Sequence, residues 1–174
     1  MCKLHIAGVV NDSITDGPGL RFTVFTQGCP HGCEGCHNPQ THPFEGGEET
    51  TAEALCVRVA ANPLLTGVTL SGGEPFCQAA ALVPFARFVR ERGLELAAYT
   101  GYTWEQLQRL DSDARELVSL CHVIVDGRFE LARRSLSLRF RGSGNQRILD
   151  VAQSLADGAP RLMCDGRWQT CAAE

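Results

Sequence analysis

Three cysteines lie close together in the sequence GCPHGCEGCHNP, which spans residues 28–39. Cys29, Cys33 and Cys36 have the spacing C-x3-C-x2-C. Thiolates are soft ligands that bind zinc, copper(I) or the iron of iron-sulfur clusters. Three cysteines are one too few for a structural zinc site, and also for a cluster whose irons are all held by the protein. This spacing therefore leaves one position of a metal centre open for a substrate or a cofactor.

A closed zinc site is the alternative that the cysteine loop leaves open. One histidine, His31, His37 or His42, would complete the four ligands of a zinc knuckle. A second motif, SGGEP at residues 71–75, favours the open site. A zinc knuckle needs no such partner, whereas two consecutive glycines expose backbone groups that a ligand can approach closely.

The elements that must position these motifs alternate between strands and helices. Strands with their following turns are predicted at 21–27, 67–73, 94–102 and 122–129, and helices at 50–63, 77–93, 103–110 and 112–120. The helix at 77–93 contains Pro84, a kink position, and ends at Gly93. Because each motif follows a strand, the pattern predicts an α/β fold whose site lies at the carboxyl ends of parallel strands.

Length and composition limit the kind of protein. The chain has 174 residues, of which 44% are hydrophobic, and we expect a single domain over residues 1–174. Its net charge of -4 does not favour nucleic acid or an anionic membrane as a partner.

No apolar run suits a signal peptide or a spanning helix, so a cytoplasmic location is expected. The odd number of cysteines, nine, agrees with a reducing compartment. Outside the cluster, a buried apolar role is expected for Cys2, Cys56, Cys77, Cys121, Cys164 and Cys171.

Taken together, the motifs resemble those of the radical S-adenosylmethionine (SAM) superfamily, which carries C-x3-C-x2-C after the first strand and a GGEP-like motif after the second. The sequence DGPGLRFTVFTQGC at residues 16–29 narrows the resemblance to the activating proteins of glycyl-radical enzymes. TGY at 100–102, VDGRF at 125–129 and SLRFRGSGNQRI at 137–148 are similar to the activating proteins of anaerobic ribonucleoside-triphosphate reductase. The likeness covers residues 10–150, which leaves a C-terminal tail, 151–174, of unknown role.

The resemblance implies the cofactors and the residues that bind them. Cys29, Cys33 and Cys36 would hold a 4Fe-4S cluster whose open iron binds SAM. The residues implied to contact SAM are Gly35, Cys36, His37, Ser71, Gly72, Gly73 and Glu74. The implied chemistry is reductive cleavage of SAM to methionine and a 5'-deoxyadenosyl radical, which removes a hydrogen atom from a glycine of the partner reductase. This oxidoreductase chemistry belongs to the cofactor, so no side chain is predicted as a catalytic acid or base.

The resemblance also implies the architecture and the partners. A full eight-stranded barrel takes about 250 residues, so we expect an incomplete, open (β/α) barrel of radical SAM type whose open side admits the protein substrate. The reductase is the implied protein partner, and flavodoxin or ferredoxin is an implied electron donor. Between Arg128 and Arg147 lie six arginines and a single acid, Glu130, which is either a solvated face or a contact at the mouth of the site.

Two other functions remain open from the sequence. The nearer one is activation of a different glycyl-radical enzyme, such as pyruvate formate-lyase, which shares the cysteine and glycine motifs. The farther one is a zinc-binding or electron-transfer module without SAM chemistry. For the tail, which contains Cys164 and Cys171, a surface helix or a partner contact is expected.

Overall fold

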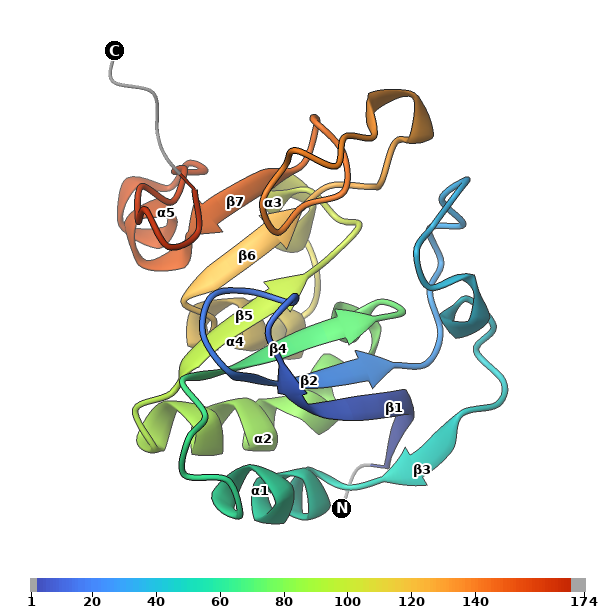
Figure 1. Ribbon diagram of the computed structural model, residues 1–174, viewed down its shortest axis with the longest axis vertical. Coiled ribbons are helices and arrows are strands. Elements are labelled where there is room, and N and C mark those ends of the chain that lie inside the picture. The colour runs from blue at the N-terminus through green and yellow to red at the C-terminus, as the bar shows by residue number, and fades with distance from the viewer. Residues whose placement is uncertain (1–2, 170–174) are drawn as a thin grey trace.

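Seven strands and five α-helices make up the part of the chain that the computed structural model describes, residues 3–169 (Figure 1). The strands are β1 (Leu4–Ser13), β2 (Arg21–Thr26), β3 (Glu48–Thr50), β4 (Gly67–Gly72), β5 (Glu95–Tyr99), β6 (Val123–Asp126) and β7 (Arg147–Asp150). The helices are α1 (Ala52–Ala60), α2 (Ala79–Glu91), α3 (Trp104–Leu107), α4 (Ser112–Leu120) and α5 (Val151–Asp157). Three short 3-10 helices are η1 (Pro39–Thr41), η2 (Pro75–Gln78) and η3 (Leu131–Arg133).

One sheet contains the seven strands in the order β3-β1-β2-β4-β5-β6-β7. Its four central strands, β2, β4, β5 and β6, are parallel, which confirms the predicted strands and their direction. The flanking strands β1, β3 and β7 pair antiparallel and are not among the predicted strands. Because the edge strands β3 and β7 do not pair with each other, the sheet does not close, as expected for an incomplete, open (β/α) barrel.

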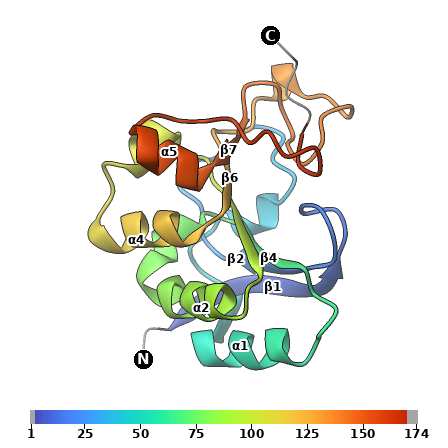
Figure 2. The same cartoon turned by 90° about the vertical axis from the view of Figure 1, so that its left-hand side faces the viewer.

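Helices cover one face of this sheet. Figure 2 shows α1, α2 and α4 together on that face, with the long loops on the other side. In α2 the buried side chains of Leu82, Phe85 and Val89 recur at helical spacing and form part of the main core. The helix continues through Pro84 and ends as predicted at Gly93, whose positive φ of 72° allows Leu94 N to donate to Val89 O. Within residues 3–169, no helix has both the length and the hydropathy needed to cross a lipid bilayer.

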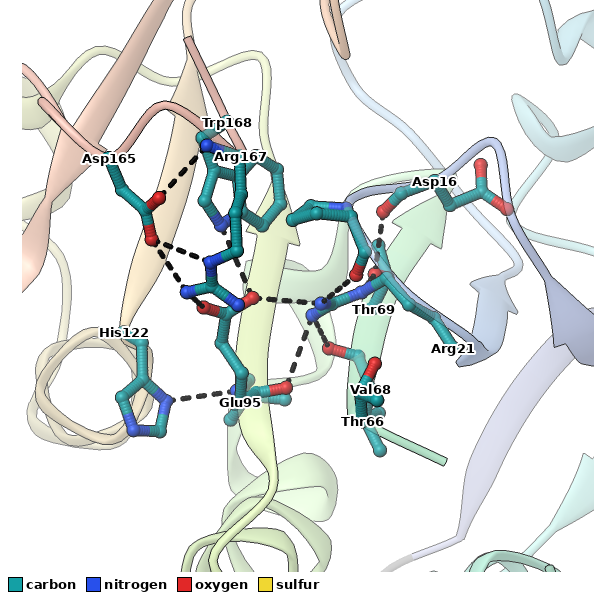
Figure 3. Close-up of polar contacts among 12 residues, drawn as sticks. Asp16, Arg21, Thr66, Val68, Thr69, Glu95, His122, Asp165, Arg167 and Trp168 are labelled. Atoms are coloured by element: carbon teal, nitrogen blue, oxygen red, sulfur yellow. Dashed lines mark hydrogen bonds and ion pairs between the residues drawn. The ribbon is translucent and has the colours of Figure 1, made fainter. Parts of the chain in front are cut away.

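A buried arginine ties the amino ends of three parallel strands together (Figure 3). Arg21 of β2 donates from Nε to Thr69 Oγ1 at 2.7 Å and from Nη2 to Val68 O at 2.8 Å, both in β4. It also donates from Nη1 to Glu95 Oε1 of β5 at 2.8 Å. Burial lowers the pKa of Arg21, and the carboxylate of Glu95 opposes that shift. This end of the sheet is therefore fixed by a hydrogen-bonded ion pair that leaves the opposite end for the site.

After α5, residues 158–169 of the C-terminal tail fold back onto the loop-bearing face of the sheet (Figure 2). Trp168 is 0% exposed and packs with a second buried cluster from the last strands of the sheet. Its indole Nε1 donates to Glu95 Oε1 at 3.2 Å, and its ring lies edge-on to Phe140 with centroids 5.4 Å apart. The tail is thus more than the surface helix or partner contact that its sequence indicates, because Trp168 belongs to the interior.

The buried role expected for the cysteines outside the cluster is confirmed for Cys121 and is wrong for Cys77 and Cys164, which are exposed, while Cys56 is partly buried. Cys2 and Cys171 lie outside the described residues.

Trp168→Phe is expected to lower the free energy of unfolding by about 2 kcal/mol, because the smaller ring loses packing volume and the hydrogen bond to Glu95. Denaturant unfolding of the protein under anaerobic, thiol-reducing conditions measures this change. Val57→Ala, at an exposed position of α1, is the control and should change the same quantity by less than about 0.5 kcal/mol. Equal stabilities for Trp168→Phe and the parent protein would contradict an interior role for the tail.

Candidate active site

A cavity of about 560 Å³ opens at the carboxyl ends of the parallel strands. Figure 1 shows β2, β4, β5 and β6 pointing towards this edge. The loop after each strand contributes to the lining: the three cysteines after β2, Ser71–Gly73 at the end of β4, Tyr99–Gly101 at the end of β5, and Gly127 after β6. The four motifs predicted to meet at one edge of the sheet therefore share one cavity, whose volume suits a small-molecule ligand.

The cysteine loop curls around this cavity because its glycines adopt backbone angles that other residues avoid. Gly28, Gly32 and Gly35 have φ values of 94°, 59° and 70°, which agrees with the prediction that glycines tighten the loop. Gly28 N donates to Thr41 O at 2.8 Å, so the base of the loop is tied to η1. All three cysteine side chains are partly buried and line the cavity.

The chemistry of the donor set fits an iron-sulfur cluster better than a single ion. Burial raises the pKa of the Cys29 thiol, and the Glu74 carboxylate and the other two thiols raise it further. A cationic metal centre would reverse that effect, because metal coordination deprotonates thiols. Within the described residues 3–169, no three His, Cys, Asp or Glu side chains converge closely enough to hold one ion. A 4Fe-4S cluster spreads its thiolates over separate irons and does not need such convergence.

The three histidines that could complete a zinc knuckle line the same cavity as the cysteines, but no three ligands converge among residues 3–169. His31 Nε2 donates to Glu74 Oε2 at 2.7 Å. His37 packs against Phe129 with ring centroids 5.1 Å apart. The backbone carbonyl of His42 accepts from Cys29 N at 3.0 Å. The described chain thus gives the zinc-knuckle alternative no assembled set of ligands.

The glycines of SGGEP allow β4 to meet the cysteine loop backbone to backbone. Gly73 N donates to Thr26 O and Glu74 N donates to Gly28 O, both at 2.8 Å. A Cβ atom on Gly73 would lie 2.3 Å from Gly28 O, and Gly72 has a φ of 90°. No side chain fits at either position without moving backbone. Consequently, Ser71, Gly72 and Gly73 present main-chain groups to the cavity.

Glu74 does not line the cavity. Its carboxylate is 0% exposed and is satisfied by protein donors. Oε1 accepts from Phe76 N at 3.1 Å, and Oε2 accepts from Gly101 N at 2.9 Å and from His31 Nε2 at 2.7 Å. Thr100 Oγ1 donates to the same group at 2.9–3.0 Å. We call this set, His31, Glu74, Thr100 and Gly101, the Glu74 clamp.

The clamp explains TGY at residues 100–102 in physical terms. Thr100 and Gly101 supply two of the donors to Glu74. Only glycine fits at position 101, because a Cβ atom there would lie 2.2 Å from His31 Cδ2. Tyr102 lies edge-on to the His31 ring with centroids 4.6 Å apart, and burial raises the pKa of Tyr102 to about 12. His31 stands between two of the cysteines, so the clamp fastens the middle of the cysteine loop to the ends of β4 and β5.

The segment RGSGNQR closes against the end of β6. Gln146 Oε1 accepts from Gly142 N at 2.8 Å, and its Nε2 donates to Gly127 O at 3.0 Å. Arg147 donates from Nε to Asp126 Oδ1 at 3.0 Å, and this bonding to Asp126 raises the pKa of Arg147. Arg141, Gly142 and Gln146 line the cavity, so of the two interpretations that the sequence leaves open for this region, a position at the mouth of the site holds for this segment.

The structure places most of the predicted site residues together. Cys29, Cys33, Cys36, His37, Ser71, Gly72 and Gly73 line the cavity, whereas Gly35 and Glu74 do not. Gly35 instead leaves room for Leu131, which a Cβ at this position would approach to 2.9 Å. Sequence reasoning missed the cavity residues Tyr99, Phe129 and Phe140. The motif VDGRF contains Phe129, but aromatic residues near strand ends carry no signal that separates a cavity wall from a core.

Comparison with known proteins adds independent findings. A family model described as a 4Fe-4S single cluster domain matches residues 15–149. The chain is 34% identical over 148 residues to the anaerobic ribonucleoside-triphosphate reductase-activating protein of Pasteurella multocida, a match that covers 80% of this chain and 93% of that protein. The protein of the same name from Vibrio cholerae is 33% identical over 144 residues, with 78% and 90% coverage.

Two further similarities differ in extent. The pyruvate formate-lyase-activating enzyme of Clostridium pasteurianum is 36% identical over 134 residues, which cover 73% of this chain and 56% of that enzyme. Among solved structures, QueE from Escherichia coli aligns with a TM-score of 0.48 at 18% identity, covering 58% of this chain and 53% of that one.

Proposed function

Since this chain belongs to the radical SAM family of anaerobic ribonucleoside-triphosphate reductase-activating proteins, we propose that it generates the glycyl radical of such a reductase. The match over nine-tenths of the relatives' length carries this proposal. Activation of pyruvate formate-lyase is the second candidate, and the lower coverage of that enzyme, 56%, makes it the weaker one. Membership in the family brings a 4Fe-4S cluster and SAM as cofactors.

We assign the three cysteines, Cys29, Cys33 and Cys36, as the ligands of the cluster. Their partly buried thiols border a cavity that also holds the main-chain groups of Ser71–Gly73, and this arrangement leaves space beside the sulfurs for SAM. When bound, the cluster and SAM together supply a 5'-deoxyadenosyl radical, the species that takes a hydrogen atom from a glycine of the reductase. The chain's own task is to position these groups and to exclude competing reactants.

The residues around the cysteines would divide the binding of SAM among them. Main-chain groups of Ser71, Gly72 and Gly73, which line the cavity, would receive its amino acid part. His37, which packs on Phe129, offers an aromatic surface suited to adenine. Glu74 would contribute through its backbone and by holding His31, since its carboxylate already has protein donors. Gly35 would act by letting Leu131 approach the loop.

We further propose that the whole described chain acts as one radical SAM domain in the cytoplasm, with flavodoxin or ferredoxin as the electron donor. Cys29, Cys33 and Cys36 are free thiols, so all three are available to bind iron. The open edge of the sheet leaves a side of the cavity for a protein substrate to approach.

The test of this function uses the full chain reconstituted anaerobically with iron and sulfide, then reduced and mixed with SAM. We expect 5'-deoxyadenosine by chromatography, and a glycyl radical by electron paramagnetic resonance when the anaerobic reductase is added. Pyruvate formate-lyase in place of the reductase should give no radical. A radical on pyruvate formate-lyase alone would establish the second candidate, and a loaded, reduced protein that cleaves no SAM with either partner would overturn both.

A further inference from the structure

A strongly basic segment stands beside the mouth of the cavity. Residues 128–141, which we call the arginine arm, connect β6 to the turn before β7 and contain η3. The arm has five arginines and one acid, a net charge of +4 in a chain of net charge -4, so the other residues together carry -8. Such a separation of charge within a small protein creates a positive electrostatic potential near the arm, although the net charge of the chain is negative.

Much of the arm's charge is not neutralised by ion pairs with other residues of the described range, 3–169. Arg128, Arg133, Arg134 and Arg139 are exposed. Arg133 has only a long pair with Glu130, 3.6 Å between two half-exposed side chains. Within residues 3–169, neither Arg128 nor Arg134 forms an ion pair with another described residue. An arginine exposed in this way keeps its donors available for a carboxylate from outside.

The arm also carries apolar side chains and adjoins the candidate active site. Phe129 and Phe140 turn into the cavity. Leu131 lies against Gly35 of the cysteine loop and is 43% exposed, while Leu136 is 90% exposed. Figure 1 shows the arm, in orange, rising on the same side as the cysteine loop. The segment that follows the cysteine loop and η1 adds a third exposed apolar side chain, because Phe44, which lies against Gly28, is 61% exposed.

We propose that the arginine arm is a docking surface for an acidic segment of the protein substrate that also carries apolar side chains. The inference rests on the proposed function, because a glycine of the substrate must reach the cavity beside which the arm stands. Exposed arginines would pair with carboxylates of the substrate, and Leu131 and Leu136 would be covered by its apolar residues. Charges at the rim of an interface act mainly by steering the partners together.

The composition of the arm favours a protein over a nucleic acid as its occupant. Single-stranded nucleic acids need exposed aromatic rings for base stacking, yet both aromatic rings of the arm face the cavity. Exposed leucines among the arginines suit apolar protein side chains instead. The excess negative charge over the remaining residues would also repel a polyanion longer than the arm.

The test compares binding of the anaerobic reductase to the full-length activating protein and its variants. We expect Arg133→Glu combined with Arg134→Glu to raise the Kd at least about tenfold at low salt and to flatten its salt dependence. Cleavage of SAM without the reductase should be unchanged, because neither arginine lines the cavity. Arg133→Lys with Arg134→Lys should keep most of the affinity. The matched control reverses two exposed arginines elsewhere, Arg109→Glu with Arg115→Glu, and should bind as the parent does.

The possible results distinguish a failure of the docking inference from a failure of the proposed function. If the parent protein binds and activates the reductase and the reversal at 133 and 134 binds equally well, the docking inference is wrong and the proposed function stands. If the parent neither binds nor activates the reductase, the proposed function itself fails. Binding of a labelled single-stranded oligonucleotide that is lost on reversal, with reductase binding intact, would overturn the inference in favour of a nucleic-acid surface.

Discussion

Cys33→Ala is expected to lower SAM cleavage by on the order of a thousandfold or more, equivalent to about 4 kcal/mol in the barrier. The reason is that the variant retains only two of the three cysteines that line the cavity. A cluster held by two cysteines loses a protein ligand on one iron and is expected to fall short in iron content. The measurements are 5'-deoxyadenosine formation, iron per chain, and cluster absorbance at about 400 nm.

Cys56→Ala is the matched control for that experiment. Cys56 is also a free, partly buried cysteine, but it lies in α1, on the helical face of the sheet. We expect this variant to bind iron and to cleave SAM as the parent protein does. Full iron content and full cleavage in Cys33→Ala would show that the cysteine triad is not the ligand set. Loss of both in Cys56→Ala would point to damage that any cysteine replacement causes.

The parallel centre of the fold can be predicted because each of its strands is a short apolar run that precedes a glycine-containing turn. β4 illustrates this, since its buried Val68 and Leu70 lead directly into Gly72 and Gly73. The edge strands β3 and β7 lack such a signal, because no glycine-containing turn follows either of them. Both are also short, and both depend on pairing with strands distant in the sequence.

The candidate site likewise has one part that the sequence predicts and another that it does not. The cysteine loop can be recognised from sequence because its ligands and glycines are consecutive and their chemistry is specific. The role of Glu74 cannot be predicted from sequence, because its carboxylate accepts hydrogen bonds from three separate segments of the chain, His31, Phe76 and Thr100–Gly101. The tail is similar: Trp168 becomes interior only because Glu95 and Phe140 come together in the folded chain.

Glu74→Gln is expected to destabilise the protein by about 3 kcal/mol, the upper end of the cost of leaving a buried donor without its acceptor. The geometry explains why an isosteric amide does not substitute. Oε1 faces Phe76 N and Oε2 faces Gly101 N, and both of these are backbone donors. Whichever way the glutamine amide is turned, its NH2 group meets a backbone N–H, and one buried donor loses its acceptor.

The effect of Glu74→Gln on iron uptake distinguishes a specific role of the Glu74 clamp in holding the cysteine loop from a general role in stability. His31 loses its charged acceptor in Glu74→Gln, so the cysteine loop is held less firmly and iron uptake should fall under conditions where the chain is still folded. Glu116→Gln is the control, because Glu116 pairs with Arg87 at the surface and its loss should cost no more than about 1 kcal/mol. Denaturant unfolding of the apo protein measures stability, and iron per folded chain measures the loop. Lower stability with unchanged iron uptake would mean that the Glu74 clamp stabilises the fold but does not hold the cysteine loop for iron binding. Unchanged stability would contradict any stabilising role of the clamp.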